Sequence, residues 1–388
     1  MRALALKPPE LVPSPETDWL LLRAFAPPEL AAPAIVPTLA LDLARKLGLA
    51  SRIAGRTPSA VLDTELGPVA RELSNERFVT AATDALLMRA LELTAQAARR
   101  IGAPLVGLKF AALRVRHLAR AGQRRAHDVD VLTCRAMAQR LRSELLAQGC
   151  SEPGVRGHDH QLAPVMTPDG VPVEIHLHIP GVRLPGSRRF VGADELLAAG
   201  LVDAHFGLAV PDIAVVTAHA LAHGFLQNAG APGSHSLLCT FADLSDILGS
   251  HPGALSASIA FLKPSFDDED GALTGELVRQ LESGNLAEAR RGPGGTLLRH
   301  ALAARLDARY ASALRLRLLT QPLSDRPFPL GLATALQTAL FPTPKELEAI
   351  YGAPLSGPSL AVRRLLRPAD LAWRALNAGA SRIIARWR

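Results

Sequence analysis

Two aspartates separated by a single residue, Asp128 and Asp130, begin an apolar segment that ends at Leu132. Successive side chains of a β-strand point to opposite faces, so two residues at this spacing lie on the same face. There they are close enough to share a divalent cation, while Val129 between them points into the core. The pattern therefore predicts a strand that carries a pair of metal-binding carboxylates.

A third carboxylate comes from residues 171–179, where apolar and polar residues alternate strictly. The alternation places Glu174, His176 and His178 on one face of a predicted strand and four aliphatic residues on the other. Magnesium, like manganese, prefers oxygen ligands and usually keeps waters or substrate phosphates in its shell. Two or three carboxylates on adjacent strands therefore suit Mg²⁺ (or Mn²⁺) bound together with a nucleotide.

These residues need a sheet to position them, and the neighbouring segments predict one. Asp169-Gly170 is a strong signal for a tight hairpin, which would pair the strands on either side of it in antiparallel fashion. The expected strands are 104–109, 128–132, 160–166 and 171–179, and the expected helices are 111–120 and 135–148. We expect a mixed sheet of about four strands with at least two helices.

Several motifs follow one another in an order that is more specific than any one of them. They are Leu108-Lys109, Arg124 followed by Asp128-Val-Asp130, His160-Gln-Leu-Ala-Pro-Val165, Val173-Glu-Ile-His176, His219-Ala-Leu-Ala-His223-Gly224, Phe241-Ala-Asp-Leu-Ser-Asp-Ile247, Leu340-Phe-Pro-Thr-Pro344 and Tyr351-Gly352. Together they resemble the bacterial uncharacterised nucleotidyltransferase family of the polymerase-β-like superfamily. The resemblance implies an α+β fold, in which a small mixed β-sheet nucleotidyltransferase core is joined by extensive N- and C-terminal helical regions.

The resemblance also implies a reaction and a set of roles. Asp128 and Asp130 would hold the metal against a nucleoside triphosphate such as ATP, and Glu174 would act on the acceptor hydroxyl or join them as a metal ligand. Lys109, Arg124 and His176 would contact the nucleotide, with Lys109 or Arg124 neutralising phosphate charge. The chain would then move a nucleoside monophosphate to a hydroxyl of a small-molecule or peptide acceptor.

One departure from the family pattern leaves a second hypothesis open. The family usually has Leu-Lys-Gly where this chain has Leu108-Lys109-Phe110, and a glycine lets backbone N–H groups approach a phosphate closely. Either Lys109 takes the phosphate as a point charge, or the nucleotide is held elsewhere. The alternative is a catalytically degenerate member that keeps the fold and serves as a binding or scaffold module.

Composition and charge limit the class of protein. With 388 residues and 48% hydrophobic content, the chain can bury a large core and suggests two or three domains. The net charge is +7, but residues 361–388 hold seven arginines and one acid, so the rest of the chain carries only +1. A basic footprint spread over the body is absent and aromatic residues make up 4%, which argues against nucleic-acid binding.

The cysteines and the apolar segments indicate a compartment. Cys134, Cys150 and Cys239 are widely spaced, which fits neither a disulfide framework nor a zinc knot. No apolar stretch is long enough for a membrane span, and the N-terminus lacks the apolar run of a signal sequence. We therefore expect a cytoplasmic protein with reduced thiols.

The order of predicted elements suggests three regions: an N-terminal helical region (1–100), the nucleotidyltransferase core (101–195) and a C-terminal helical domain with a basic tail (196–388). Nearly everything from Ala193 onward is expected to be helical. The N-terminal helices are expected at 37–48, 58–66 and 71–101, preceded by one that begins near Thr17 and ends before Pro27.

Three features of the C-terminal half need separate interpretation. His219 and His223 share one helical face, but Ala220 replaces the glutamate of a zinc metalloprotease, so they are interpreted as polar contacts to the nucleotide site or as helix packing. Asp267-Asp-Glu-Asp270 is expected to be a solvated loop. The arginine-rich tail either packs as the last helices, lies on an anionic membrane surface, or docks an acidic partner or peptide acceptor.

Overall fold

The computed structural model describes residues 8–10, 12–155, 157, 159–205, 208–227, 237–263, 265–307, 310, 362, 365–367, 369 and 370. The motifs at 340–344 and 351–352 and nearly all of the basic tail lie outside the described residues, so the interpretations of the tail stay predictions. No described helix is both long enough and apolar enough to cross a bilayer.

The N-terminal region is helical, as the sequence predicts. Its helices are α1 (Pro15–Phe25), α2 (Pro37–Leu47), α3 (Ala50–Arg56), α4 (Ser59–Leu66), the 3₁₀ turn η2 (Gly67–Val69) and α5 (Ala70–Ile101). Helix α1 begins two residues before the predicted Thr17, because the Ser14 side chain accepts a hydrogen bond from the Thr17 backbone and caps it. Gly48 and Gly102 end α2 and α5 with left-handed φ angles of 76° and 66°.

Six strands form one mixed sheet in the order β3-β4-β2-β1-β6-β5. They are β1 (Val106–Gly107), β2 (Val129–Leu132), β3 (Val165–Met166), β4 (Pro172–His176), β5 (Val202–His205) and β6 (Leu208–Pro211). Strands β3 and β4 pair in antiparallel fashion around Gly170, whose φ is 78°, so the predicted hairpin is confirmed. Strands β2 and β4 run parallel, and Asp130 lies directly beside Glu174.

The expectation of about four strands, with helix from Ala193 onward, was wrong. After α8 (Ala193–Ala198) the chain forms the β5–β6 hairpin, and β6 pairs in parallel with β1 through Ala209 and Val106. Each of these strands has four residues, too few for an alternating pattern to stand out, and their place depends on pairing with a strand about 100 residues earlier. The sheet thus extends beyond residue 195, where we expected the core to end.

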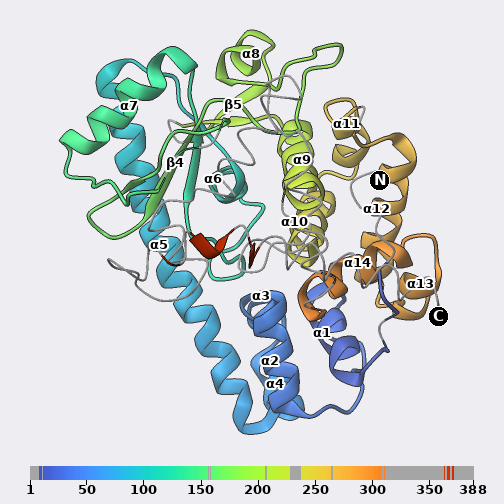
Figure 1. Cartoon of the computed structure of the whole chain (residues 1–388). Coiled ribbons are helices and arrows are strands. Elements are labelled where there is room, and N and C mark those ends of the chain that lie inside the picture. Colours follow the sequence, from blue (N-terminus) through green and yellow to red (C-terminus); the bar gives the residue numbers. More distant parts are fainter. Residues whose placement is uncertain are drawn as a thin grey trace.

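The two faces of β2 and β4 have different partners. Val129, Val131, Val173 and Ile175 point to one face and pack with α5 and with α7 (Arg135–Ala147). In Figure 1, α5 runs past the sheet and continues beyond it toward the N-terminal helices. The opposite face carries Asp130, Glu174 and His176, and it is approached by Lys109 at the start of α6 (Lys109–Val115) and by His219 of α9 (Ile213–Leu221). The alternation predicted from the sequence therefore separates a packing face from a polar face.

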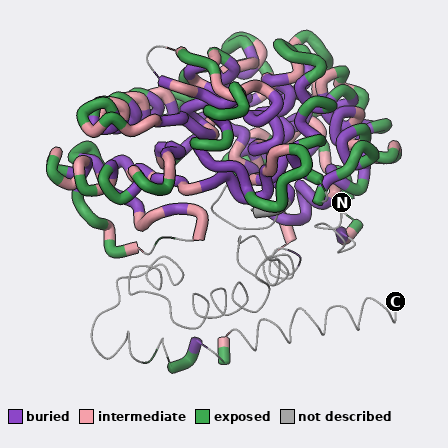
Figure 2. The backbone as a smooth tube through the Cα atoms, turned by 90° about the horizontal axis from the view of Figure 1, so that it is seen from above, coloured by how far each residue is buried: buried purple, intermediate pink, exposed green. Residues whose placement is uncertain are grey.

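The remaining helices follow α9. They are the π-helical turn η3 (Ala222–Gln227), α10 (Leu237–Ser250), α11 (Ala254–Ile259), α12 (Asp268–Glu282), α13 (Leu286–Arg291) and α14 (Gly295–Leu306). Four of them, α10, α12, α13 and α14, pack against the N-terminal region. Trp19 of α1 belongs to the same apolar cluster as Phe241 and Leu277, and Arg52 of α3 bonds Asp246 of α10 at 2.6 Å. Buried segments run through the middle of the described part of the molecule (Figure 2).

The acidic run at residues 267–270 is not the loop we expected. Asp267 caps α12, and its side chain and that of Asp270 bond each other's backbone N–H in a capping box. Carboxylates are stabilised at a helix N-terminus, where the first N–H groups lack partners. Helix formation therefore outweighs the repulsion between these like charges.

Candidate active site

Asp130 lies at the centre of a group of buried charges on the polar face of the sheet. Its Oδ1 accepts hydrogen bonds from Lys109 Nζ at 2.6 Å and from His176 Nε2 at 2.8 Å. His176 Nε2 also lies 3.7 Å from Oε2 of Glu174. The Asp130 side chain is 1% exposed, so water does not screen these interactions.

Three neighbouring strands bring this group together. Glu174 and His176 extend from β4 on the face that also carries Asp130 of β2, because the two parallel strands are in register. Lys109 follows β1, which pairs with β2, and the Leu108 N–H donates to the Asp130 carbonyl at 3.0 Å. The predicted convergence of Lys109, Asp130, Glu174 and His176 is therefore present.

The turn from β1 into α6 is strained at Lys109 and not at Phe110. Lys109 has a φ of 42°, while Phe110 is absent from the described non-glycine residues with positive φ. A positive φ costs a residue with a side chain roughly 1 kcal/mol or more, and such strain gathers at functional sites. Phe110 is 1% exposed and packs in the apolar cluster of the sheet, so it serves the core where the family has a glycine.

Electrostatics fix the charge states of this group. Burial alone would raise the pKa of Asp130, but Lys109 and the hydrogen bond from His176 outweigh burial and hold that pKa well below its usual range. Burial would likewise lower the pKa values of Lys109 and His176, and the neighbouring carboxylates raise both above their ordinary values. Asp130 is therefore ionised and Lys109 is protonated before any ligand binds.

Asp128 is placed differently from the sequence prediction. It precedes β2, is half-buried, and is not one of the carboxylates whose oxygens lie within 4.8 Å of the other possible ligand atoms. Burial, followed by repulsion from Asp130, raises the pKa of Asp128 to about 7. Asp130 is therefore buried and ionised, while Asp128 lies just before the strand and holds its proton more tightly. Both line one cleft, and the sharing of a metal ion by the two aspartates stays a prediction.

The residues present fit a divalent cation. Among the described residues, Asp130, Glu174 and His176 each offer a ligand atom, and these atoms all lie within 4.8 Å of one another. Oδ2 of Asp130 is buried without a hydrogen-bond partner, which is costly for a carboxylate oxygen and would be relieved by a cation. Two carboxylates and an imidazole form a donor set suited to Mn²⁺, and to Mg²⁺ when substrate oxygens complete the shell.

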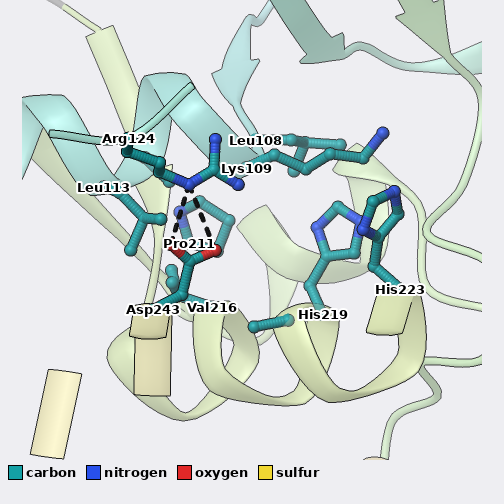
Figure 3. Close-up of a pocket in the computed structure, with 11 residues that line it drawn as sticks. Leu108, Lys109, Leu113, Arg124, Pro211, Val216, His219, His223 and Asp243 are labelled. Atoms are coloured by element: carbon teal, nitrogen blue, oxygen red, sulfur yellow. Dashed lines mark hydrogen bonds and ion pairs between the residues drawn. The ribbon is translucent and has the colours of Figure 1, made fainter. Parts of the chain in front are cut away.

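Arg124 lies in the loop before β2 and is held by a partner that the sequence did not predict. Its Nε donates to both carboxylate oxygens of Asp243 in α10, at 2.8 and 3.1 Å (Figure 3). Burial would lower the pKa of Arg124, but Asp243 raises it overall. Asp243 thereby positions Arg124 beside the polar face of the sheet.

His219 and His223 lie beside Lys109. Their ring centroids are 6.3 Å apart, and both rings point toward the Lys109 side chain (Figure 3). His219 is 4% exposed, and burial, assisted by the charge of Lys109, lowers its pKa to about 3. The cavity that these residues line with Arg124 and Asp243 has a volume of about 20 Å³, enough for one water molecule.

A larger cleft of about 570 Å³ opens over this group. Its lining comes from α2, α6, the loop before β2, η3, α10 and α14: Arg45, Lys46, Gly48, Lys109, Phe110, Arg124, Arg125, Ala126, His127, Asp128, Asp130, His223, Cys239 and Arg305. Two of the lining side chains, Asp128 and Asp130, are carboxylates, and six are lysines or arginines. We call the group around Asp130, with its neighbour Glu174, the carboxylate end of the cleft, and the exposed cations Lys46 and Arg125 the basic end. A cleft of this size holds a ligand as large as a nucleotide.

The family model described as "Uncharacterised nucleotidyltransferase" matches residues 33–248, which is more than half of the chain. The chain belongs to this nucleotidyltransferase family. The matched range runs from before α2 to residue 248, near the end of α10, and includes every cleft-lining residue except Arg305. No curated protein and no solved structure matches the chain.

Sequence reasoning missed several residues of this nucleotidyltransferase's cleft. Arg45 and Lys46 looked like the ordinary cationic end of a helix, and Asp243 looked like one acid within a helical motif. Only the packing of α2 and α10 against the core places them beside Lys109 and Arg124. A local signal existed for Arg45 and Lys46, because Gly48 predicts where α2 ends and so which residues occupy its last turn.

Proposed function

We propose that this protein is a metal-dependent nucleotidyltransferase that moves a nucleoside monophosphate from a nucleoside triphosphate to a hydroxyl group of an acceptor. The observation that carries the proposal is the in-register placement of Asp130 beside Glu174, with His176 and Lys109 bonded to the same Asp130 oxygen. The membership of the family and the cleft over these residues support it.

Asp130 would hold the metal ion, with Asp128, His176 or Glu174 as a further ligand. A bound Mg²⁺ or Mn²⁺ would supply positive charge against the phosphate oxygens. Asp128, whose pKa is about 7, would have to lose its proton to act as a ligand. The carboxylate oxygen of Asp130 that lacks a partner is the one available to a cation.

The chain's own residues have separate roles in the transfer. Glu174, with 23% of its side chain exposed, would accept the proton of the acceptor hydroxyl as the oxygen bonds to the α-phosphorus. The bond from that phosphorus to the bridging oxygen breaks at the same time, and pyrophosphate leaves. Lys109 and Arg124 would offset the negative charge that develops on the phosphate oxygens.

The test is nucleotide binding followed by transfer. Purified protein should show a magnesium-dependent rise in melting temperature with at least one nucleoside triphosphate, because a ligand that binds only the folded state stabilises it. Asp130→Asn should abolish that rise and the transfer. Absence of any such rise in the wild-type chain would favour the degenerate binding module, an interpretation supported by Lys109 bonding Asp130 and by the buried Phe110.

A further inference from the structure

The cleft concentrates positive charge in a protein whose body is nearly neutral. Six lysine and arginine side chains line it against two carboxylates. Outside residues 361–388, the whole chain has a net charge of only +1. The positive charge of the cleft is therefore local and is not part of a basic surface that covers the whole protein.

Only some of these cations already have partners. Lys109 bonds Asp130, the Nε of Arg124 bonds Asp243, and Arg45 bonds Glu72 at 3.2 Å and Glu76 at 2.7 Å. Lys46 and Arg125 are exposed and form no ion pair with any residue in the described part of the chain. Two cations thus line the cleft without a counter-charge from the described residues.

The carboxylate end of the cleft is poorly equipped for a whole triphosphate. Asp128, Asp130 and Glu174 lie near a single lysine, Lys109, whose ammonium is already bonded to Asp130. The turn that follows β1 has no glycine through which backbone N–H groups could approach a phosphate, because Phe110 fills that position and packs in the core. The outer phosphates need charge from another part of the cleft.

We propose that Lys46 and Arg125 bind the terminal phosphates of the triphosphate, so that helix α2 of the N-terminal region forms part of the nucleotide site. This inference rests on the proposed function. Lysine provides a compact positive charge, and arginine provides a planar fork that matches two phosphate oxygens. Side chains would then replace the backbone amides that a glycine turn offers.

The same observations argue against a nucleic-acid occupant. A nucleic acid requires a positive surface that extends along its backbone and aromatic side chains on which bases stack. The cleft's aromatic rings are Phe110, whose side chain is buried, and the imidazoles of His127 and His223. A short polyphosphate chain matches two unpaired cations in a cleft of about 570 Å³.

Calorimetric titration of the full-length chain with inorganic tripolyphosphate in magnesium-free buffer tests this proposal. Lys46→Gln and Arg125→Gln should each weaken binding about tenfold, and the double variant about a hundredfold, since each removes a charge-assisted contact worth on the order of 1.4 kcal/mol. Arg71→Gln is the matched control, because Arg71 is exposed on α5 outside the cleft lining. That control should stay within about twofold of wild type, as expected for one exposed charge that does not line the cleft.

Two results would overturn the proposal. One is an affinity for tripolyphosphate that is unchanged in both cleft variants or reduced equally in Arg71→Gln, which would leave only general electrostatic attraction. The other is an equilibrium affinity for nucleoside triphosphate that is unchanged in Lys46→Gln and Arg125→Gln, which would show that the two cations do not contact its phosphates. Both results are independent of transfer, so the proposed function can fail in the Asp130→Asn assay while tripolyphosphate binding persists.

Discussion

The two ends of the cleft hold charge in different ways. At the carboxylate end, Asp130 is buried and its partners Lys109 and His176 are already bonded to it. At the basic end, Lys46 and Arg125 are exposed and have no ion-pair partner among the described residues. The side chains around Asp130 are held in place before a ligand binds, and such preorganised charges favour catalysis. Lys46 and Arg125 form their charge interaction only when a ligand binds, so they contribute to affinity.

The comparison also predicts what each substitution will disturb. Removing one member of a buried charged group leaves the others without compensation, which destabilises the fold as well as the site. Removing an exposed cation disturbs binding and leaves stability nearly unchanged. Changes at the carboxylate end should therefore affect folding and turnover together, and changes at the basic end should affect affinity alone.

The largest effect is expected from Asp130→Asn. Loss of this carboxylate should reduce the rate of transfer about a thousandfold or more. The metal ion would lose its main ligand and could no longer stabilise the charge that develops on the phosphate. The free energy of unfolding should also fall by about 3 kcal/mol, since Lys109 and His176 remain buried without their shared acceptor. Single-turnover kinetics and urea unfolding measure the two effects.

Asp128→Asn is the matched variant two residues away. It should also reduce transfer about a thousandfold, but it should change stability by less than about 1 kcal/mol, because Asp128 is half-buried and its raised pKa already favours a neutral side chain. Activity within about tenfold of wild type in both variants, a loss of only ~1.4 kcal/mol, would end the metal-site proposal.

The next largest effect is expected from Glu174→Gln. This variant distinguishes a role in the chemical step from a role in binding the nucleotide at the carboxylate end. If Glu174 accepts the hydroxyl proton, kcat should fall about a hundredfold while the Kd for nucleotide stays within about twofold of wild type. Rapid-quench kinetics gives kcat, and equilibrium titration gives the Kd for nucleotide. Equal losses in both would make Glu174 a metal ligand, and no loss in either would make it structural.

The sequence predicted the carboxylate end better than the basic end. Alternation over 171–179 identified the face that carries Glu174 and His176, and periodicity predicted α5 almost to the residue, because these signals are local. The strands β5 and β6, the Arg124–Asp243 ion pair and the place of Lys46 depend on contacts between segments far apart in the chain. Strand β2 begins one residue later than expected, so Asp128 lies just before it.

Acidification provides the third prediction, through the buried imidazole beside Lys109. Burial lowers the pKa of His219 from 6.5 to about 3, so the folded protein favours the neutral ring. This contribution to stability is fully present above pH 6.5 and is lost as the pH falls toward 3, where the unfolded chain binds a proton that the folded chain does not. By pH 5 the loss should be about 2 kcal/mol.

Urea unfolding of wild type and His219→Gln at pH 7.5 and pH 5 measures the contribution of His219 to the pH dependence of stability. The wild-type free energy of unfolding should fall more between the two pH values than that of the variant, by about 2 kcal/mol. For each protein, the free energy of unfolding at pH 5 is subtracted from its own value at pH 7.5. The packing cost of the substitution is the same at both pH values and therefore cancels. An identical pH dependence in the two proteins would show that His219 does not remain neutral in the folded state.

The smallest effect is expected at Arg45, the neighbour of Lys46 on α2. Both residues line the cleft, but the Arg45 guanidinium is held by Glu72 and Glu76 of α5, and 40% of its side chain is exposed. Held in that position, it cannot contact a phosphate without breaking two ion pairs, and an exposed ion pair contributes only about 0–1 kcal/mol to stability. Arg45→Gln should therefore weaken tripolyphosphate binding less than threefold, or about 0.6 kcal/mol, against the tenfold expected for Lys46→Gln.

Both variants remove one charge from the same helix, so a difference between them measures direct contact rather than net charge. Equal losses at the two positions would mean that the basic end acts as a diffuse field, and the distinction between paired and unpaired cations would no longer explain affinity.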